Sequence, residues 1–167
     1  MFGRKRRDPV EVRSEETPTG GRRSVATSVR EVPLDLAFRA ATDYEHYAEF
    51  MPRTVEARVE SRTEDEVVFQ TALDFLVKRV RYRLRLALDR AAGRVTWSMI
   101  DGDLARCEGS WQFEDLGGGK TRITYTTWIE VDYAIPKRAL NKLVGASLPD
   151  VIERTVERAR ALGQSGA

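Results

Sequence analysis

Residues 42–58, TDYEHYAEFMPRTVEAR, form a corner at which a helical pattern gives way to a strand pattern. Four large side chains recur there at steps of three and four, and therefore share one face of a short helix: Tyr44, Tyr47, Phe50 and Met51. Pro52 ends that helix, because proline donates no backbone hydrogen bond and disfavours helical geometry in the residue before it. A bulky, largely aromatic face of this kind needs an apolar surface to pack against.

The sequence before this corner predicts a strand and then a helix. Over residues 24–32, apolar and polar residues alternate with a period of two, which is typical of a strand with one buried face. Pro33 follows at a position suited to the first turn of a helix, where its missing N–H costs nothing. Apolar residues at helical spacing then predict a first helix that ends at about Thr42: Leu34, Phe38 and Ala41.

The sequence after the corner predicts six strands in succession, at about 54–62, 66–75, 77–89, 94–100, 105–115 and 121–133. Short connectors rich in turn residues join them, such as AAG at 91–93 and LGGG at 116–119, so we expect an antiparallel meander. In the third of these runs apolar residues alternate with a row of four arginines, which predicts one buried and one wet face: Arg79, Arg81, Arg83 and Arg85.

Residues 136–162 predict one long amphipathic helix, with an apolar stripe that extends from Leu140 to Leu162. Pro149 lies inside it and is expected to bend it, because the ring removes one backbone hydrogen bond and crowds the preceding turn. The order is therefore one strand, two short helices, six strands and a long helix. This order predicts an α+β fold with a seven-stranded antiparallel sheet and helices segregated from the strands.

The composition suits a single domain with a charged leader. The chain has 167 residues, 41% of them hydrophobic, and a formal net charge of +2. Residues 1–23 contain seven Lys or Arg against four Asp or Glu, so the tail is positive and the remainder is close to neutral. Few large apolar residues lie in the tail to offset its ordering entropy. We therefore predict a disordered basic tail at 1–22, a domain at 23–163 and a disordered C-terminus at 164–167.

Cysteine and histidine usage excludes several site classes. The chain has one cysteine, Cys107, and one histidine, His46, so it has no disulfide framework, and we expect no metal site built from those residues. No nucleophile, phosphate-loop or metal motif stands out, so we assign no catalytic residue, metal or cofactor. We interpret His46 as a solvated surface residue and Cys107 as a small buried one. The start of the chain has no apolar run of signal-peptide length, which favours a cytoplasmic protein.

Four features carry a resemblance to a known superfamily: the entry Val32-Pro33, FRAATDYEHYAEFMP at 38–52, GSWQFE at 109–114 followed by GGGKTRITY at 117–125, and the closing helix. Over about residues 24–162 the chain resembles the START-like (SRPBCC, helix-grip) superfamily, in its polyketide cyclase/dehydrase and coenzyme Q-binding branch. Ala48 departs from the proline that relatives often carry there. The resemblance implies that the sheet curves around the long helix and encloses a cavity, which the aromatic corner helps to wall.

The inner faces of the predicted elements give a candidate ligand cavity without charged side chains: Tyr44, Tyr47, Phe50, Phe69, Thr71, Leu73, Tyr82, Leu84, Trp97, Met99, Trp111, Tyr125, Thr127, Val144, Ser147, Leu148, Val151, Ile152 and Thr155. Such a cavity suits a quinone, an isoprenoid or another lipid, because burial of apolar groups supplies affinity and a few hydroxyls orient the ligand. The same residues could instead fill a solid core.

Two other functions stay open. A polyketide cyclase would use the cavity to orient its substrate, with hydrogen bonds from Tyr82, Tyr125 or Thr71; a buried carboxylate or a Tyr/His pair would favour it. The arginine row at 79–85 could instead contact RNA or a ribosome if acids leave it unpaired. The segment GRKRR at 3–7 could touch an anionic membrane. The sequence does not indicate an oligomeric state.

Overall fold

The computed structural model describes residues 9–75, 78–131 and 137–165, and within these ranges the side chains of residues 75, 137 and 139–146 are not described. The elements follow in the order β1 (Glu11–Glu16), β2 (Arg22–Glu31), α1 (Leu34–Ala41), the 3-10 turn η1 (Tyr44–His46), α2 (Tyr47–Phe50), β3 (Thr54–Arg62), β4 (Glu66–Phe75), β5 (Lys78–Asp89), β6 (Arg94–Gly102), β7 (Arg106–Gly117), β8 (Lys120–Glu130) and α3 (Lys137–Ser165). The predicted α+β class and the antiparallel meander are confirmed.

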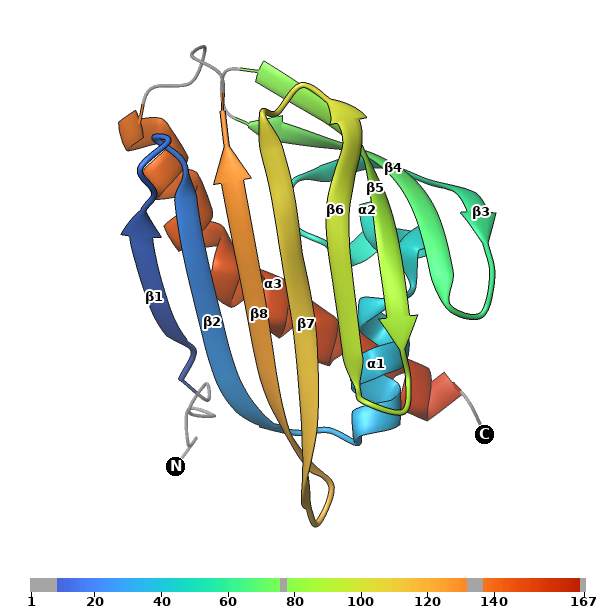
Figure 1. Ribbon diagram of the computed structural model, residues 1–167. Helices are drawn as coiled ribbons and strands as arrows, with labels where there is room; N and C mark the ends of the chain where they lie inside the picture. The colour runs from blue at the N-terminus through green and yellow to red at the C-terminus, as the bar shows by residue number, and fades with distance from the viewer. Residues whose placement is uncertain (1–8, 76–77, 132–136, 166–167) are drawn as a thin grey trace.

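All the strands belong to one antiparallel sheet in the order β1-β2-β8-β7-β6-β5-β4-β3 (Figure 1). The sheet has eight strands and not the predicted seven, because β1 pairs with the free edge of β2 from Glu11 opposite Thr27 to Glu16 opposite Arg22. The predicted disorder is therefore wrong for residues 11–16, while residues 1–8 lie outside the described residues. Composition missed this strand because its stabilisation comes from backbone pairing and from opposite charges across the pair, such as Glu16 and Arg22, and hardly from burial.

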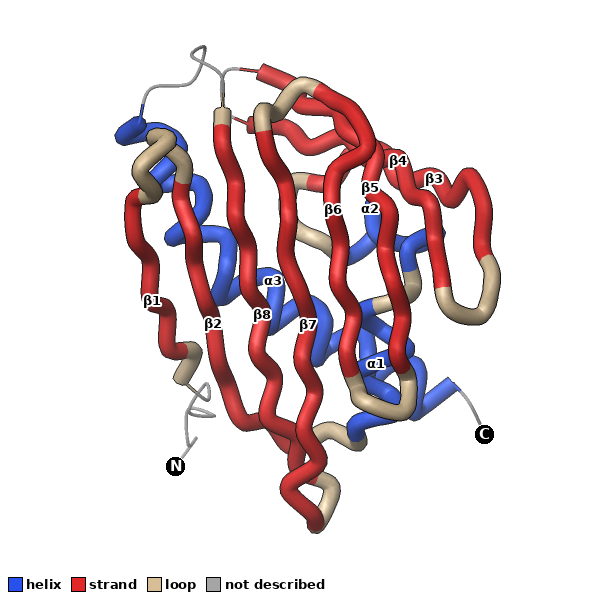
Figure 2. Tube along the Cα trace, viewed as in Figure 1, coloured by secondary structure: helices blue, strands red, loops and turns tan. Residues whose placement is uncertain are grey.

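The long helix α3 lies across one face of the sheet, behind the strands in the view of Figure 1. Figure 2, drawn from the same direction, shows the other helices behind the sheet as well. The helix contacts α1, β1, β2 and β8. It continues through Pro149 and reaches Ser165, so the predicted disordered C-terminus begins too early; residues 166–167 lie outside the described part. Leu162 packs on the core close to this end, which keeps the last turns in place.

One half of the space between sheet and helix is solidly packed. Ile152, Val156 and Ala159 of α3 are fully buried there. The rings of Phe38 from α1 and Phe113 from β7 meet edge to face, with centroids 6.1 Å apart. Such close packing is what fixes a helix on a sheet, because each buried contact adds a small attractive energy. The other half, under the first described side chains of α3, is not filled in this way.

Within the part of the chain that the structure describes, no helix combines the length and the apolar character needed to cross a membrane.

Candidate ligand cavity

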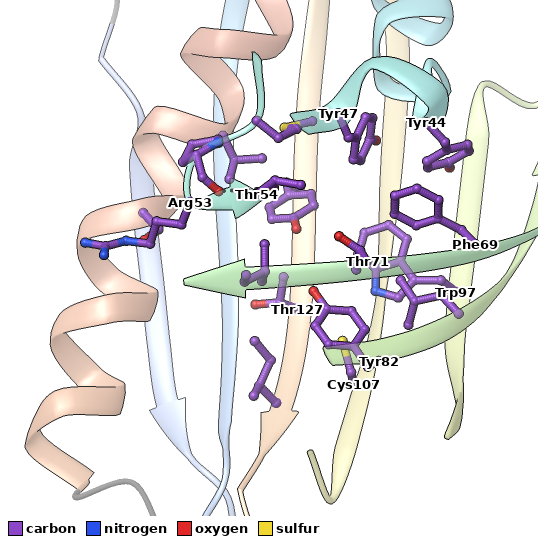
Figure 3. Close-up of a pocket in the computed structure, with 18 of the residues that line it drawn as sticks. Tyr44, Tyr47, Arg53, Thr54, Phe69, Thr71, Tyr82, Trp97, Cys107 and Thr127 are labelled. Carbon is purple, nitrogen blue, oxygen red and sulfur yellow. Dashed lines mark hydrogen bonds between the residues drawn. The ribbon is translucent and has the colours of Figure 1, made fainter. Parts of the chain in front are cut away.

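The unfilled half of the interior is a cavity of about 170 Å³, walled by the concave face of the sheet, by the corner between η1 and β3, and by α3 (Figure 3). Strands β4 to β8 supply alternate residues to it, because side chains two apart on a strand point to the same face. Their register brings the lining pairs together, as with Thr71 opposite Tyr82 and Phe69 opposite Leu84. Ser147, Leu148 and Val151 close it from the helix side.

Fourteen of the nineteen residues that the sequence places in the cavity line it: Tyr44, Tyr47, Phe69, Thr71, Leu73, Tyr82, Leu84, Trp97, Trp111, Tyr125, Thr127, Ser147, Leu148 and Val151. Four others lie elsewhere: Phe50, Met99, Ile152 and Thr155. The side chain of Val144 lies outside the described residues.

The residues that miss the cavity have other packing partners. The ring of Phe50 lies against Tyr47, with Arg158 over its face at 5.5 Å. Thr155 is fully buried, and its hydroxyl donates to the carbonyl of Val151, one turn earlier in α3. Ile152 belongs to the packed half of the interior. Met99 lies on β6 opposite Leu84 and is half-buried against the core, but its side chain does not line the cavity.

Seven further residues line the cavity beyond that set: Met51, Pro52, Arg53, Thr54, Leu86, Cys107 and Ile129. The period of two along β5, β7 and β8 places three of them on inner faces, since Leu86 shares a face with Leu84 and Cys107 is the register partner of Ile129. Met51 was already on the aromatic face of the corner. The inclusion of residues 52–54 depends on how the chain turns there, which no periodicity reveals.

Aromatic rings form two groups on the cavity wall. Tyr44 packs between Tyr47 and Phe69, with ring centroids 4.9 and 5.1 Å away. Across the sheet, Tyr125 contacts Trp111 and Trp97, with centroids 4.4 and 5.6 Å apart. These rings give the cavity large, rigid, apolar walls. The aromatic face of the corner at residues 42–58 therefore packs on an apolar surface of the sheet, because Tyr44 and Tyr47 both contact Phe69.

A glycine makes the second aromatic group possible. Gly109 on β7 is the register partner of Trp97 on β6. A Cβ atom at this position would lie 2.3 Å from Cζ2 of the Trp97 ring and 2.3 Å from the backbone oxygen of Thr126. Only the absence of a side chain at Gly109 lets the indole lie flat against the strand.

The hydroxyl groups of the cavity differ in availability. Thr71 donates to the carbonyl of Glu56 at 2.9 Å, and the hydroxyl of Tyr47 donates to the carbonyl of Ala41. Tyr82 and Tyr125 form no side-chain hydrogen bond with any residue that the structure describes. Figure 3 shows the hydroxyl of Tyr82 directed into the group of lining side chains. Burial raises the pKa of both tyrosines, so each stays a neutral donor at physiological pH.

The hydroxyl groups of Tyr44 and Thr127 are fully buried and have no hydrogen-bond partner among the described residues. Cys107 is also buried, and burial raises the pKa of its thiol from 9.0 to about 12. The thiol is therefore protonated at neutral pH and is a poor nucleophile there.

Charge is confined to one point of the wall. Among the lining residues that the structure describes, Arg53 is the only one with a charged side chain, and neither a carboxylate nor a histidine is present. The two features that would have favoured a cyclase are thus missing from the described wall. The described residues also contain no group of three or more His, Cys, Asp and Glu side chains placed to hold a metal ion.

The arginine row lies on the opposite, solvent-facing side of the sheet, and every member is ion-paired. Arg79 binds Asp74, Arg81 binds Glu56 and Arg85 binds Glu66, at 2.8 to 3.2 Å. Arg83 binds both Glu60 and Asp101, at 2.8 and 2.7 Å. Its hydrogen bond lowers the pKa of Glu60. An RNA surface would need unpaired cations, so this pairing contradicts the condition for the RNA hypothesis.

His46 lies on the exposed side of the corner, as expected. Its Nδ1 atom is 2.7 Å from Oδ1 of Asp43, and this hydrogen bond is the main reason that the pKa of His46 is raised. Asp43 also accepts two hydrogen bonds from Arg158 of α3, at 2.8 and 3.0 Å. The corner is thereby tied to the helix at the edge of the cavity.

Solved structures with this fold include proteins of three distant bacteria. TTHA0849 of Thermus thermophilus superposes with a TM-score of 0.72 at 23% identity over 82% of this chain and 96% of its own. The Zhui aromatase/cyclase of Streptomyces sp. R1128 gives 0.75 at 15% identity, over 91% and 96%. A STAR-related lipid transfer protein of Xanthomonas axonopodis gives 0.78 at 12% identity, over 94% and 97%. At these identities the likeness establishes the helix-grip fold alone.

Sequence comparison establishes the family. No curated protein gives a significant match to the sequence. The family model described as polyketide cyclase / dehydrase and lipid transport matches residues 31–156, which include the aromatic corner, strands β3 to β8 and most of α3. The chain therefore belongs to the polyketide cyclase/dehydrase and lipid transport family, within the START-like superfamily that its sequence resembles.

Proposed function

We propose that this protein binds and carries a hydrophobic small molecule, such as a quinone, an isoprenoid or another lipid, without catalysing a reaction on it. The observation that supports the proposal is the cavity of about 170 Å³ with aromatic and aliphatic walls. An unfilled apolar space costs packing energy, which a ligand would restore. The name of the family includes lipid transport, which agrees with this proposal.

The size of the cavity sets the size of the part that enters it. An apolar cavity of about 150 Å³ in another protein accepts a benzene ring, so this one has room for a single ring or a short branched chain. Arg53 is exposed, so the part of a longer chain that does not fit in the cavity would extend into solvent beside this residue. Each CH₂ that is buried contributes about 0.8 kcal/mol.

The free tyrosine hydroxyls favour a ligand that accepts hydrogen bonds inside the cavity. Tyr82 and Tyr125 are neutral donors without a described partner, and the carbonyl of a quinone ring is a matching acceptor. A purely hydrocarbon ligand would leave both hydroxyls without a partner. We therefore rank a ring that carries a carbonyl above a simple alkane chain.

Tryptophan fluorescence tests the proposal directly. Trp97 and Trp111 line the cavity, whereas Trp128 stacks with Arg106 away from it, with the guanidinium 4.2 Å from the ring centroid. A short-chain quinone should quench the first two in a saturable way. The variant with both Trp97→Phe and Trp111→Phe retains Trp128 as a control and should lose the saturable part. Equal, linear quenching of both proteins would reject quinone binding in this cavity.

A polyketide cyclase is the second candidate, favoured by the same two tyrosine donors, which could polarise a carbonyl of a substrate. The Zhui aromatase/cyclase has this fold. Under this alternative Tyr82→Phe or Tyr125→Phe would lower product formation from a linear polyketide while ligand binding persisted. If the purified protein forms no cyclised product from such a substrate, the carrier proposal stands.

A further inference from the structure

Arg53 occupies a particular place on the cavity wall. Of the lining residues in the described part of the chain, it alone has a charged side chain, and it is exposed. Figure 3 shows its guanidinium at the edge of the group, pointing away from the labelled aromatic side chains. The wall therefore changes from apolar to cationic where the cavity meets solvent.

The backbone holds Arg53 in a conformation that arginine rarely adopts. Its φ angle is 60°, and it is the only non-glycine residue with a positive φ in the described part of the chain. Glycine or asparagine would adopt this conformation with less strain. The backbone N–H of Asp74 donates to the carbonyl of Arg53 at 2.9 Å and holds the corner from the neighbouring strand β4. The base of the side chain is thus fixed at the opening.

The guanidinium of Arg53 has no partner among the described residues. The four arginines on the outer face all have carboxylates within 3.2 Å, but Arg53 forms no ion pair or side-chain hydrogen bond with any residue that the structure describes. A guanidinium presents its donors as a flat fork that matches a carboxylate or a phosphate. Its donor groups can therefore bind an anion that enters with the ligand.

We propose that the ligand of this cavity is an amphiphile with a terminal anionic group, a carboxylate or a phosphate, which Arg53 binds at the opening while the apolar part lies inside. This inference rests on the proposed function and narrows its ligand class. The cation orients the ligand, because the apolar walls alone would accept either end. A phosphate on an isoprenoid and the carboxylate of a fatty acid share this chemistry. A ligand of either kind whose apolar part also carries a carbonyl would in addition pair with the hydroxyls of Tyr82 and Tyr125.

Two dyes with nearly the same apolar skeleton test the inference. The phenyl ring of each matches the single ring that the cavity has room for, and the naphthalene would lie at the opening. 8-Anilinonaphthalene-1-sulfonate carries an anion in place of the carboxylate or phosphate, and N-phenyl-1-naphthylamine is its neutral counterpart. The protein should bind the anionic dye about ten-fold more tightly than the neutral one. Arg53→Asn should remove this preference, with a much larger loss of affinity for the anionic dye than for the neutral one, because asparagine tolerates a positive φ and has no charge. Arg53→Lys should keep part of it.

Three controls are needed: one for the loss of a positive charge elsewhere on the surface, one for poor folding of the variant, and one for whether the anionic group is a carboxylate or a phosphate. Arg58→Gln, an exposed change of equal charge on β3 outside the cavity wall, should leave the preference intact. Arg53→Gly removes the side chain and relieves the positive φ, so it serves if Arg53→Asn folds poorly. Competition by dodecanoate, dodecyl phosphate and dodecanol then tells a carboxylate from a phosphate, with the alcohol expected to be weakest.

Equal binding of the two dyes, unchanged in Arg53→Asn, would overturn the anionic ligand class and leave the carrier proposal in place. Failure of both dyes and all three competitors to bind the wild-type protein would overturn the carrier proposal itself, and the inference with it.

Discussion

Gly109 is the residue on which the shape of the aromatic wall depends most directly. In Gly109→Ala the new methyl group would collide with the Trp97 ring and with a backbone oxygen that β8 holds in place. We expect a loss of about 1 to 3 kcal/mol in the free energy of unfolding, together with weaker ligand binding, because such overpacking shifts the ring into the cavity. Denaturant titration followed by tryptophan fluorescence measures the free energy of unfolding, and quinone quenching of the same fluorescence measures binding.

Gly163 provides the matched control. Its added methyl would meet only the end of the Leu36 side chain, at 2.8 Å, and it lies inside α3. Gly163→Ala should be neutral or stabilising, since alanine favours a helix over glycine by up to about 1 kcal/mol. Equal losses in the two variants would contradict the role given to Gly109.

The reactivity of Cys107 tests whether its thiol is buried in the cavity wall. Because burial raises the pKa of the thiol to about 12, we expect a bulky disulfide reagent at pH 8 to label the folded protein far more slowly than the denatured one. The folded state holds this proton more tightly, so the free energy of unfolding should fall as the pH rises above the ordinary value of 9.0. Labelling at the rate of a free cysteine would contradict the buried position.

The pattern of residue types along the strands predicted most of the residues of the cavity wall, but it did not predict the residue at the opening. Thr71, Tyr82 and Leu84 follow from the alternation along β4 and β5, which is a property of any strand. Arg53 lines the wall because the chain turns through a positive φ directly after Pro52. No pattern in the sequence marks an arginine for that conformation, so the one charged residue of the described wall was not foreseen.

The helix α3 closes one side of the cavity, and Asp43 of the corner is ion-paired to its Arg158. Asp43→Asn should lower the free energy of unfolding by about 1 to 2 kcal/mol, because the hydrogen bonds from Arg158 lose their charged acceptor at a partly exposed site. Ligand release should become faster in the same variant. Glu64→Gln, an exposed change of equal charge without a described partner, is the control.

His46 reports on the other contact of Asp43, the hydrogen bond within the corner. As the only histidine, it should give one titrating imidazole signal in NMR, with a pKa above the ordinary value of 6.5 in the wild type and nearer to it in Asp43→Asn. Because the folded pKa is raised, the stabilising contact is complete below pH 6.5 and is lost as the pH rises through the folded pKa. An unchanged pKa in the variant would show that the contact does not form.

The strand β1 shows where element prediction from composition fails. Four of residues 11–16 are charged and only Val12 is half-buried, so hydrophobic burial gives little reason for the segment to be ordered. Their order comes from the unpaired edge of β2, which is a property of the sheet and not of the segment. Strands such as β2 and β5 were predictable because each one buries an alternating face.

At the scale of the whole molecule, the interior is divided between a packed core and a cavity. The sequence left a solid core and a ligand cavity as alternatives, and the structure has both, next to each other along α3: Val156 lies in the packed half and Leu148 on the cavity wall. The residue types are equally apolar in both halves, so this division could not be predicted from periodicity.

Two matched substitutions test the division. Leu148→Trp should fill the cavity and abolish ligand binding with little change in the free energy of unfolding. Val156→Trp should cost at least about 1 to 3 kcal/mol, because no free volume surrounds that position. Thermal or denaturant unfolding compares the two, and a similar loss in both would show that the cavity is not a stable feature.

Native mass spectrometry of the protein purified from its own cells, with organic extraction of whatever is bound, tests the carrier proposal most directly. We expect a stoichiometric apolar or amphiphilic molecule on the wild-type protein and none on Leu148→Trp. A wild-type protein that is empty and that sediments with ribosomes, in a manner lost when Arg81 and Arg83 are both changed to glutamate, would contradict the proposal.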